Sequence, residues 1–151
     1  MRAEYGQQIP VRIEVLSPKN QRLTRDFFCG NPAIDDYFRL EAADDATAVT
    51  YLVIDENDEK LLAALTISCS AIFLSKKQQF STLMSAIEVV YFAVDVEYQG
   101  LRYRPGDQRS LSHYLFSYLI EMMRDISREH VGAAKIVLYS VPEAWHFYKR
   151  L

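Results

Sequence analysis

The chain has 151 residues, of which 50% are hydrophobic and 25% are charged, and its formal net charge is −3. This length predicts one domain with a proper core. The slightly acidic balance argues against a nucleic acid as a partner, because nucleic-acid-binding proteins usually carry an excess of basic residues. The sequence shows neither a signal peptide nor an apolar run of about 18 residues, so we expect a cytoplasmic protein without a membrane partner.

The two cysteines are too few for a disulfide framework and lack the spacing of a zinc site, so we expect no bound metal. Cys69 lies in an apolar run and is expected to be a small core residue. Cys29 precedes a predicted helix, whose N-terminus favours a thiolate. No histidine is spaced to serve this thiol as a base, and we therefore assign Cys29 no catalytic role.

The first half of the chain predicts three strands and a helix. Alternating apolar and charged residues predict a strand over 11–16. Asn31 has the properties of an N-cap and Pro32 suits the first helical position, so we expect a helix to begin here. Two further apolar runs, 48–54 and 61–74, predict strands that are joined by a polar hairpin turn.

Residues 75–85 are polar, and we expect an irregular segment there. The following stretch, 86–95, is largely apolar, which predicts a strand that is covered on both sides of a sheet. Strict alternation would place its apolar residues on two faces, with Ile87, Val89, Tyr91 and Ala93 on one and Val90, Phe92 and Val94 on the other. Glu88 is the one carboxylate between Ile87 and Val94.

A loop rich in arginine and glycine follows, and Ser110 then has the properties of an N-cap. Apolar residues at helical spacing predict a helix of about five turns that ends near Gly132. Residues 134–139 predict another buried strand, and Pro142 begins a last helix that runs to residue 151. Together these elements predict an α/β domain with a mixed sheet. Its strand–loop–helix unit would point backbone N–H groups at a phosphate.

The central stretch resembles a known family. Glu88-Val-Val-Tyr-Phe-Ala-Val-Asp95, followed by Glu97-Tyr-Gln-Gly100, is similar to the fourth strand and pyrophosphate loop of the GCN5-related N-acetyltransferases (GNAT). The resemblance implies a GNAT-like acyl-CoA N-acyltransferase fold in a single domain, 1–151, with 86–95 as its central strand. The family continues with two more strands at the point where this chain stops, so we expect a sheet that lacks them.

A second phrase refines the resemblance. Residues 28–37, Phe-Cys-Gly-Asn-Pro-Ala-Ile-Asp-Asp-Tyr, resemble the first helix of a GNAT subgroup. Some members of that subgroup are toxins of toxin–antitoxin pairs that acetylate charged tRNA.

The resemblance implies acetyl-CoA as the acyl donor and indicates where it would bind. The strand backbone would contact the pantetheine and the thioester through Phe92, Ala93 and Val94. The pyrophosphate loop would be formed by Gln99, Gly100, Leu101, Arg102, Tyr103, Arg104 and Gly106. The family loop reads Gln/Arg-x-x-Gly-x-Gly/Ala, and Arg102 and Arg104 fall where small residues are expected. Arginine adds bulk at these positions, but it can also bind phosphate in a bidentate manner.

Two residues are candidates for proton transfer. Glu88 matches the general-base glutamate of the histone-acetyltransferase branch, and its apolar neighbours are expected to raise its pKa. Tyr148 matches the tyrosine of the family phrase Ala-x-x-Phe-Tyr and would protonate the departing thiolate. Either residue could instead have only a structural role, Glu88 through a hydrogen bond and Tyr148 through packing.

Three functions remain open at this point. The leading one is an acyl-CoA-dependent N-acyltransferase that transfers acetyl directly to an amine of a small molecule or a protein. A tRNA-acetylating toxin and a non-catalytic binding module of the same fold are the alternatives. Acetyl-CoA and an amine acceptor are the expected partners, and a homodimer is one option for the oligomeric state.

Overall fold

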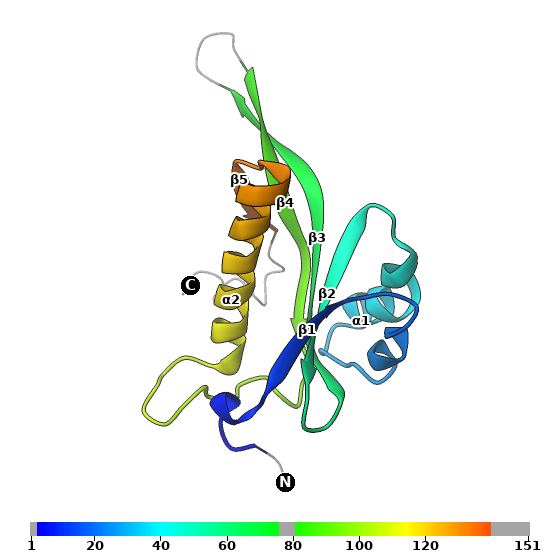
Figure 1. The fold of residues 1–151 in the computed structure, drawn as a ribbon, viewed down its shortest axis with the longest axis vertical. Helices are drawn as coiled ribbons and strands as arrows, with labels where there is room; N and C mark the ends of the chain where they lie inside the picture. The colour runs from blue at the N-terminus through cyan, green and yellow to red at the C-terminus, as the bar shows by residue number, and fades with distance from the viewer. Residues whose placement is uncertain (1–2, 76–80, 140–151) are drawn as a thin grey trace.

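The computed structural model describes residues 3–75 and 81–139, which form one five-stranded sheet in the order β1-β2-β3-β4-β5 (Figure 1). β1 to β4 pair in antiparallel fashion and β5 is parallel to β4, so the sheet is mixed as predicted. The strands are β1 (Val11–Val15), β2 (Ala48–Asp55), β3 (Lys60–Ser75), β4 (Ser81–Val94) and β5 (Lys135–Leu138), and the helices are α1 (Pro32–Asp36) and α2 (Leu111–Ile126).

Helices cover both faces of the sheet (Figure 1). On one face, Leu115, Leu119 and Met123 of α2 belong to the same buried cluster as Ile87 and Val89 of β4. On the other face, Phe27, Tyr37 and Phe38 from the segments on either side of α1 form a second cluster with Leu52 and Ile54 of β2. β4 therefore lies between two apolar layers, which confirms the prediction drawn from its continuous apolar sequence.

A β-bulge in β4 changes which residues share a face. Ile67 pairs with Val89 and Thr66 pairs with Tyr91, so Val90 is an extra residue in β4. Phe92 and Val94 consequently join the α2 side together with Ile87 and Val89, while Tyr91 and Ala93 contact the α1 side. The face assignment that we predicted from strict alternation is therefore wrong beyond Val90.

Of the segment 75–85 that we expected to be irregular, the described residues, 75 and 81–85, belong to a long hairpin. β3 continues to Ser75 and β4 begins at Ser81, and the two pair from Ser75↔Ser81 inward. Figure 1 shows this hairpin extending well beyond the body of the sheet. The prediction failed because the ladder between the two backbones continues even where the side chains are polar.

The helix boundaries follow the capping signals in the sequence. The Asn31 side chain accepts hydrogen bonds from the amides of Ala33 and Ile34, with Pro32 at the first helical position. The Ser110 side chain caps α2. A π-helical turn, Ser127–Val131, extends α2 to Gly132, which has a left-handed conformation. The helix that we predicted from Pro142 onward lies outside the described residues.

In the part of the chain that the structure describes, no helix is both long enough and apolar enough to span a membrane.

Candidate active site

One edge of β4 is paired over only a short part of its length. Residues 86–89 of β4 pair with residues 135–138 of β5, and within the described residues no strand pairs with that edge beyond Val89. The amide of Asp95 donates to the Leu62 carbonyl of β3 at 2.9 Å. Because backbone groups alternate along a strand, those of Phe92 and Val94 face the opposite edge, toward β5. This is the segment in which the family resemblance places the pantetheine and thioester.

The end of β4 is joined to the segment before α1 by a buried carboxylate. Asp95 is only 2% exposed. It accepts hydrogen bonds from the amides of Phe28 at 3.1 Å and Glu97 at 3.0 Å. The amide of Val96 in turn donates to the Phe28 carbonyl at 2.9 Å. These bonds hold the first residues of the loop in place, although Phe28 and Asp95 are far apart in the sequence.

Gln99, a predicted cofactor residue, uses its side chain to close this junction. Its Nε2 donates to the Val94 carbonyl at 2.7 Å and to the Cys29 carbonyl at 2.8 Å. The Val94 carbonyl is therefore already engaged on the edge of β4 that faces β5. Gly100 follows with φ +74°, a conformation that a residue with a side chain rarely adopts.

The middle of the loop is held by its carbonyl groups. The carbonyls of Arg102 and Tyr103 accept hydrogen bonds from the amides of Gly6 and Gln7. The amides of Leu101 and Tyr103 donate within the loop. In contrast, the amides at positions 100, 102 and 104 make no hydrogen bond with another of the described residues. Such a series of available N–H groups in a rigid loop suits a phosphate, and these positions belong to the predicted pyrophosphate loop.

The end of the loop is a tight turn that returns the chain toward Arg104. The amide of Asp107 donates to the Arg104 carbonyl at 3.2 Å, and Gly106 has φ +78°. Pro105 at the second position and a glycine of positive φ at the third are the features of a type II turn. Gly106, which we predicted as a cofactor residue, thus has a clear role in shaping the turn.

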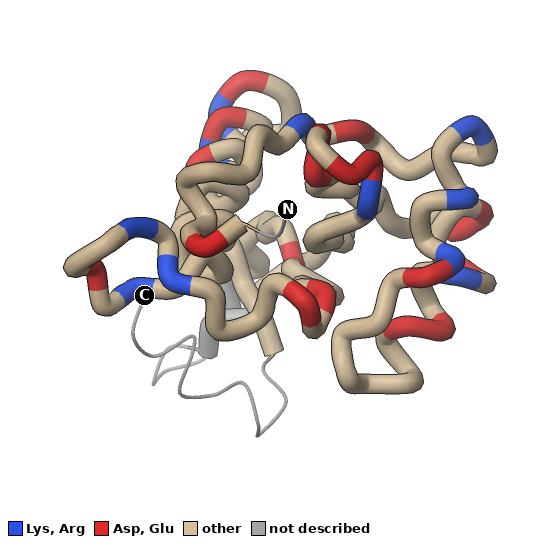
Figure 2. The backbone as a smooth tube through the Cα atoms, turned by 90° about the horizontal axis from the view of Figure 1, so that it is seen from below, with Lys and Arg blue, Asp and Glu red and all other residues tan. Residues whose placement is uncertain are grey.

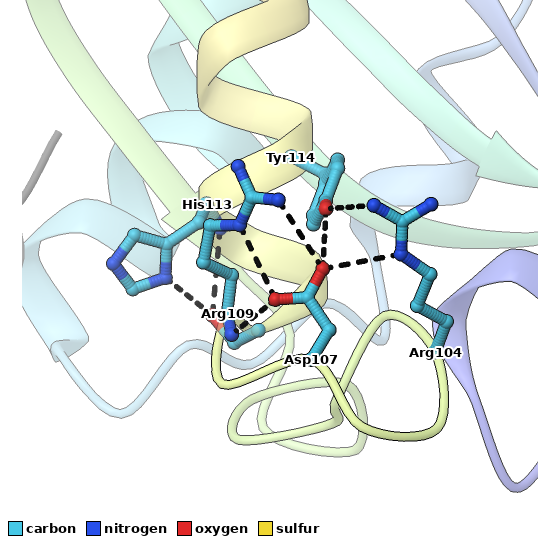
Figure 3. A network of polar contacts seen from close by, with 6 residues as sticks. Arg104, Asp107, Arg109, His113 and Tyr114 are labelled. Carbon is cyan, nitrogen blue, oxygen red and sulfur yellow. Dashed lines mark hydrogen bonds and ion pairs between the residues drawn. The ribbon is translucent and has the colours of Figure 1, made fainter.

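Asp107 is the centre of a polar network that joins this turn to α2 (Figure 3). Its carboxylate accepts hydrogen bonds from the Tyr114 hydroxyl, from Arg104 Nε at 3.2 Å, and from Arg109 Nε and Nη2 at 3.2 and 3.3 Å. These donors hold the pKa of Asp107 well below its usual range, chiefly through the Tyr114 hydroxyl. The Tyr103 and Tyr114 rings stack with centroids 3.9 Å apart.

The two arginines that replace small residues of the family loop differ in their surroundings. Arg104 is tied to Asp107 and also donates from Nη2 to the Tyr114 hydroxyl at 3.1 Å. Arg102 forms an isolated bridge with Ser110 through its backbone, and its side chain is exposed. In the described chain the Arg102 side chain has no ion pair. Figure 2 shows basic and acidic positions interspersed along the visible backbone, so the two signs of charge are mixed and not separated onto different parts of it.

Glu88 lies on the α1 side of the sheet. Its neighbours Ile87 and Val89 belong to the α2-side cluster, so alternation turns Glu88 to the opposite face. It is half-buried and lies directly across from Ser68 of β3 and Val137 of β5. Tyr148 lies outside the described residues, so the structure says nothing about its distance from Glu88.

Polar groups continue along the same face next to Glu88. The Tyr37 hydroxyl donates to Asp45 at 2.9 Å, and the Tyr37 and Tyr91 ring centroids are 4.6 Å apart. Burial and the adjacent Asp45 carboxylate raise the pKa of Tyr37 to about 12. Ser68, the residue opposite Glu88, donates from its hydroxyl to the Thr47 carbonyl at 3.0 Å. This bond ties the segment of Asp45 and Thr47 to β3.

The two cysteines are placed differently from our expectations. Cys69 is exposed, so the prediction that it belongs to the core is wrong. Cys69 lies one residue past the last pair between β2 and β3, Ala48↔Ser68, so β2 does not flank it. Burial raises the pKa of the Cys29 thiol to about 11, which overrides any stabilisation of a thiolate by the following helix.

Two hollows in the surface lie along α2. One of about 540 Å³ lies between the first residues of the chain, β1 and α2, and its lining includes Tyr103 and Tyr114 of the network. Another of about 720 Å³ lies beside β5 and the second half of α2. Neither is lined by Glu88 or by the end of β4, so the case for the site rests on the strand edge and the loop.

No model of a known protein family matches the sequence, and no curated protein matches it. Solved structures do match. A KacTA–DNA complex has a TM-score of 0.69 at 20% identity, covering 93% of this chain and 82% of that chain. AtaT complexed with acetyl-methionyl-tRNAfMet has a TM-score of 0.70 at 17% identity, covering 93% and 85%. AtaTR bound with acetyl-CoA has a TM-score of 0.67 at 18% identity, covering 93% and 82%.

The chain has the GNAT fold. This confirms the fold predicted from the strand and the first helix, and the matching structures include the toxins to which residues 28–37 pointed. Some GNAT-fold neighbours are complexes with DNA or tRNA. Our argument against a nucleic-acid partner is therefore not supported.

Four residues of the site were missed at the level of sequence: Asp95, Asp107, Arg109 and Tyr114. The phrase Arg104-Pro-Gly-Asp107 carried a readable turn signal, which would have placed Asp107 beside Arg104. Tyr114 gave no such signal, because a tyrosine at helical spacing is equally compatible with a core position.

Proposed function

We propose that this protein is an N-acetyltransferase that transfers acetyl from acetyl-CoA directly to an amine. The observation that carries the proposal is the junction of β4 and the following loop. In this fold no described strand pairs with the edge of β4 beyond Val89, and the strand is followed by a rigid loop with available amides at positions 100, 102 and 104. The neighbour AtaTR has been solved with acetyl-CoA, which supports the same donor here.

In the proposed reaction, the amine nitrogen attacks the thioester carbonyl, a C–N bond forms and the C–S bond breaks. Backbone N–H groups at the end of β4 would stabilise the developing oxyanion. Glu88 would accept the amine proton. It lies four residues before Phe92, about 13 Å along an extended strand, so we expect the proton to travel through water. Tyr148 would donate a proton to the CoA thiolate; KacT and AtaT have each been solved as a Tyr→Phe variant, the change that tests Tyr148 here.

The acceptor is a small-molecule or protein amine, or the amino group of an aminoacyl-tRNA. The second candidate is favoured by a specific observation, because AtaT has been solved with acetyl-methionyl-tRNAfMet and its structure matches 93% of this chain. Incubation of the protein with radiolabelled acetyl-CoA and either aminoacyl-tRNA or uncharged tRNA distinguishes the two classes of acceptor. Label on the charged tRNA alone supports that acceptor, and no label on either directs the search to small and protein amines.

Binding of the donor is tested by thermal unfolding with acetyl-CoA and with free CoA. At about a hundred times Kd, a ligand stabilises the folded state by about 2.7 kcal/mol, which is a shift of a few degrees. The Tyr148→Phe variant should bind equally well but turn over about a hundredfold more slowly. Absence of a shift with either ligand would refute the proposal and favour a non-catalytic module.

A further inference from the structure

Asp107 fixes the positions of two arginines rather than merely neutralising them. Its side chain is only 10% exposed, and its oxygens accept hydrogen bonds from Arg104, Arg109 and Tyr114. The amide of Arg109 also donates to Asp107 at 2.9 Å. Because the carboxylate is held from several directions, the arginines are held with it (Figure 3).

Both guanidinium groups nevertheless remain open to solvent. The side chains of Arg104 and Arg109 are 51% and 60% exposed. Each guanidinium carries five N–H donors, and the network uses two on each arginine. The Arg109 guanidinium also lies 4.7 Å from the centroid of the Tyr114 ring, and that ring stacks on Tyr103. Unused donors therefore project from a rigid aromatic and carboxylate support.

We propose that Arg104 and Arg109 form a subsite for a phosphate monoester, and that Asp107 is the positioning residue that aims their free donors. Two cations around one carboxylate leave a net positive charge. Guanidinium groups match the oxygens of a phosphate in a bidentate manner. Fixing two long side chains before the ligand arrives removes an entropic cost of binding.

The phosphate monoester that fits this place is the 3′-phosphate of CoA, an assignment that rests on the proposed function. CoA carries its thioester at one end, a pyrophosphate in the middle and the 3′-phosphate at the other end. The protein groups that would bind these three parts follow in the same order along the sequence. They are the edge of β4, the amides at 100, 102 and 104, and the side chains of Arg104 and Arg109.

Calorimetry with matched ligands tests the assignment. The parent protein should bind CoA more tightly than dephospho-CoA, and adenosine 3′,5′-bisphosphate more tightly than AMP. Asp107→Asn should weaken the two 3′-phosphorylated ligands by about tenfold, comparable to the loss of one charged hydrogen bond, and leave the other two unchanged. Glu121→Gln is the control, because Glu121 pairs with Arg124 on α2 away from the loop.

Other outcomes would overturn the inference. Equal weakening of all four ligands would mean that Asp107 only maintains the fold of the loop, and tighter binding of CoA would mean that Asp107 competes with the phosphate. No effect of Asp107→Asn would remove the network from binding altogether. If the parent binds adenosine 3′,5′-bisphosphate through Asp107 but transfers no acetyl group, the subsite stands and the proposed function fails.

Discussion

Glu88 has the position along β4 that the family resemblance assigns to a general base, and the bulge at Val90 determines what surrounds it. Before the bulge, Glu88 points to the α1 side, and after it Tyr91 points to the same side. The carboxylate and the Tyr91 ring therefore share a face although they are three positions apart. In an undistorted strand they would lie on opposite faces.

Glu88→Gln should lower the rate of acetyl transfer by about a hundredfold while leaving acetyl-CoA affinity unchanged, because the amide cannot accept the amine proton. Steady-state kinetics and calorimetry check the two expectations separately. The control is Glu129→Gln, an exposed carboxylate in the turn after α2. A variant as active as the parent would show that Glu88 is structural.

The cysteines provide a test at the same scale. The pKa of Cys29 is raised to about 11 by burial, and Cys69 is exposed. Near pH 8, about one thousandth of Cys29 is thiolate, so iodoacetamide should modify Cys69 first. The rate at Cys29 should rise steadily as pH approaches 11. Peptide mapping by mass spectrometry identifies the modified residue, and faster modification of Cys29 at pH 8 would contradict the raised pKa.

At the scale of elements, the junction between β4 and the segment before α1 organises the site. Asp95 and Gln99 both reach across to residues 28 and 29, one through its carboxylate and the other through its amide. The loop thus begins from a fixed point on β4. It ends at another fixed point, where Leu111 at the start of α2 donates its amide to the Leu101 carbonyl.

Asp95→Ala should destabilise the protein by about 1–3 kcal/mol, because it removes a buried carboxylate and leaves two part-buried amides without their acceptor. It should also weaken acetyl-CoA binding, since the loop loses its fixed start. Urea unfolding measures the first effect and calorimetry the second. Asp26→Ala serves as the control, because Asp26 is exposed. Wild-type stability of Asp95→Ala would show that the junction is not needed to hold the loop.

At the scale of the whole molecule, two tyrosines tie distant parts of the chain to the sheet. The Tyr98 hydroxyl donates to Asp55 at 2.9 Å and the Tyr37 hydroxyl donates to Asp45. Burial and the partner carboxylates raise the pKa of both phenols, that of Tyr37 to about 12. Both phenols are therefore protonated in the folded state at neutral pH.

Stability should fall above about pH 10, because the unfolded chain then loses phenolic protons that the folded state retains. Below that pH both the folded and the unfolded state keep these protons, and the two phenols make their full contribution to stability. The double variant Tyr37→Phe with Tyr98→Phe should lose less stability between pH 9 and about pH 12 than the parent. Urea unfolding at several pH values checks this, with Tyr118→Phe as an exposed control. Parallel curves for parent and double variant would exclude these phenols as the cause.

The elements of this protein could be read from short-range patterns. The apolar run of β4, the caps at Asn31 and Ser110 and the end of α2 at Gly132 depend on residues within a few positions of one another. Propensity, capping and side-chain spacing act over this range, so the sequence carries them explicitly. The two phrases that resemble GNAT proteins also lie within single elements.

The arrangement of the site and the length of the hairpin depend on long-range contacts and could not be predicted from the sequence. Which residues share a face with Glu88 depends on a bulge that exists only because β4 pairs with β3, and the length of the hairpin depends on the same pairing. Asp95 acquires its role from Phe28, 67 positions away. Asp107 and Tyr114 meet because a turn and a helix start are brought together. Such contacts form only when the chain has folded, because their partners are set by the packing of elements and not by spacing along the sequence.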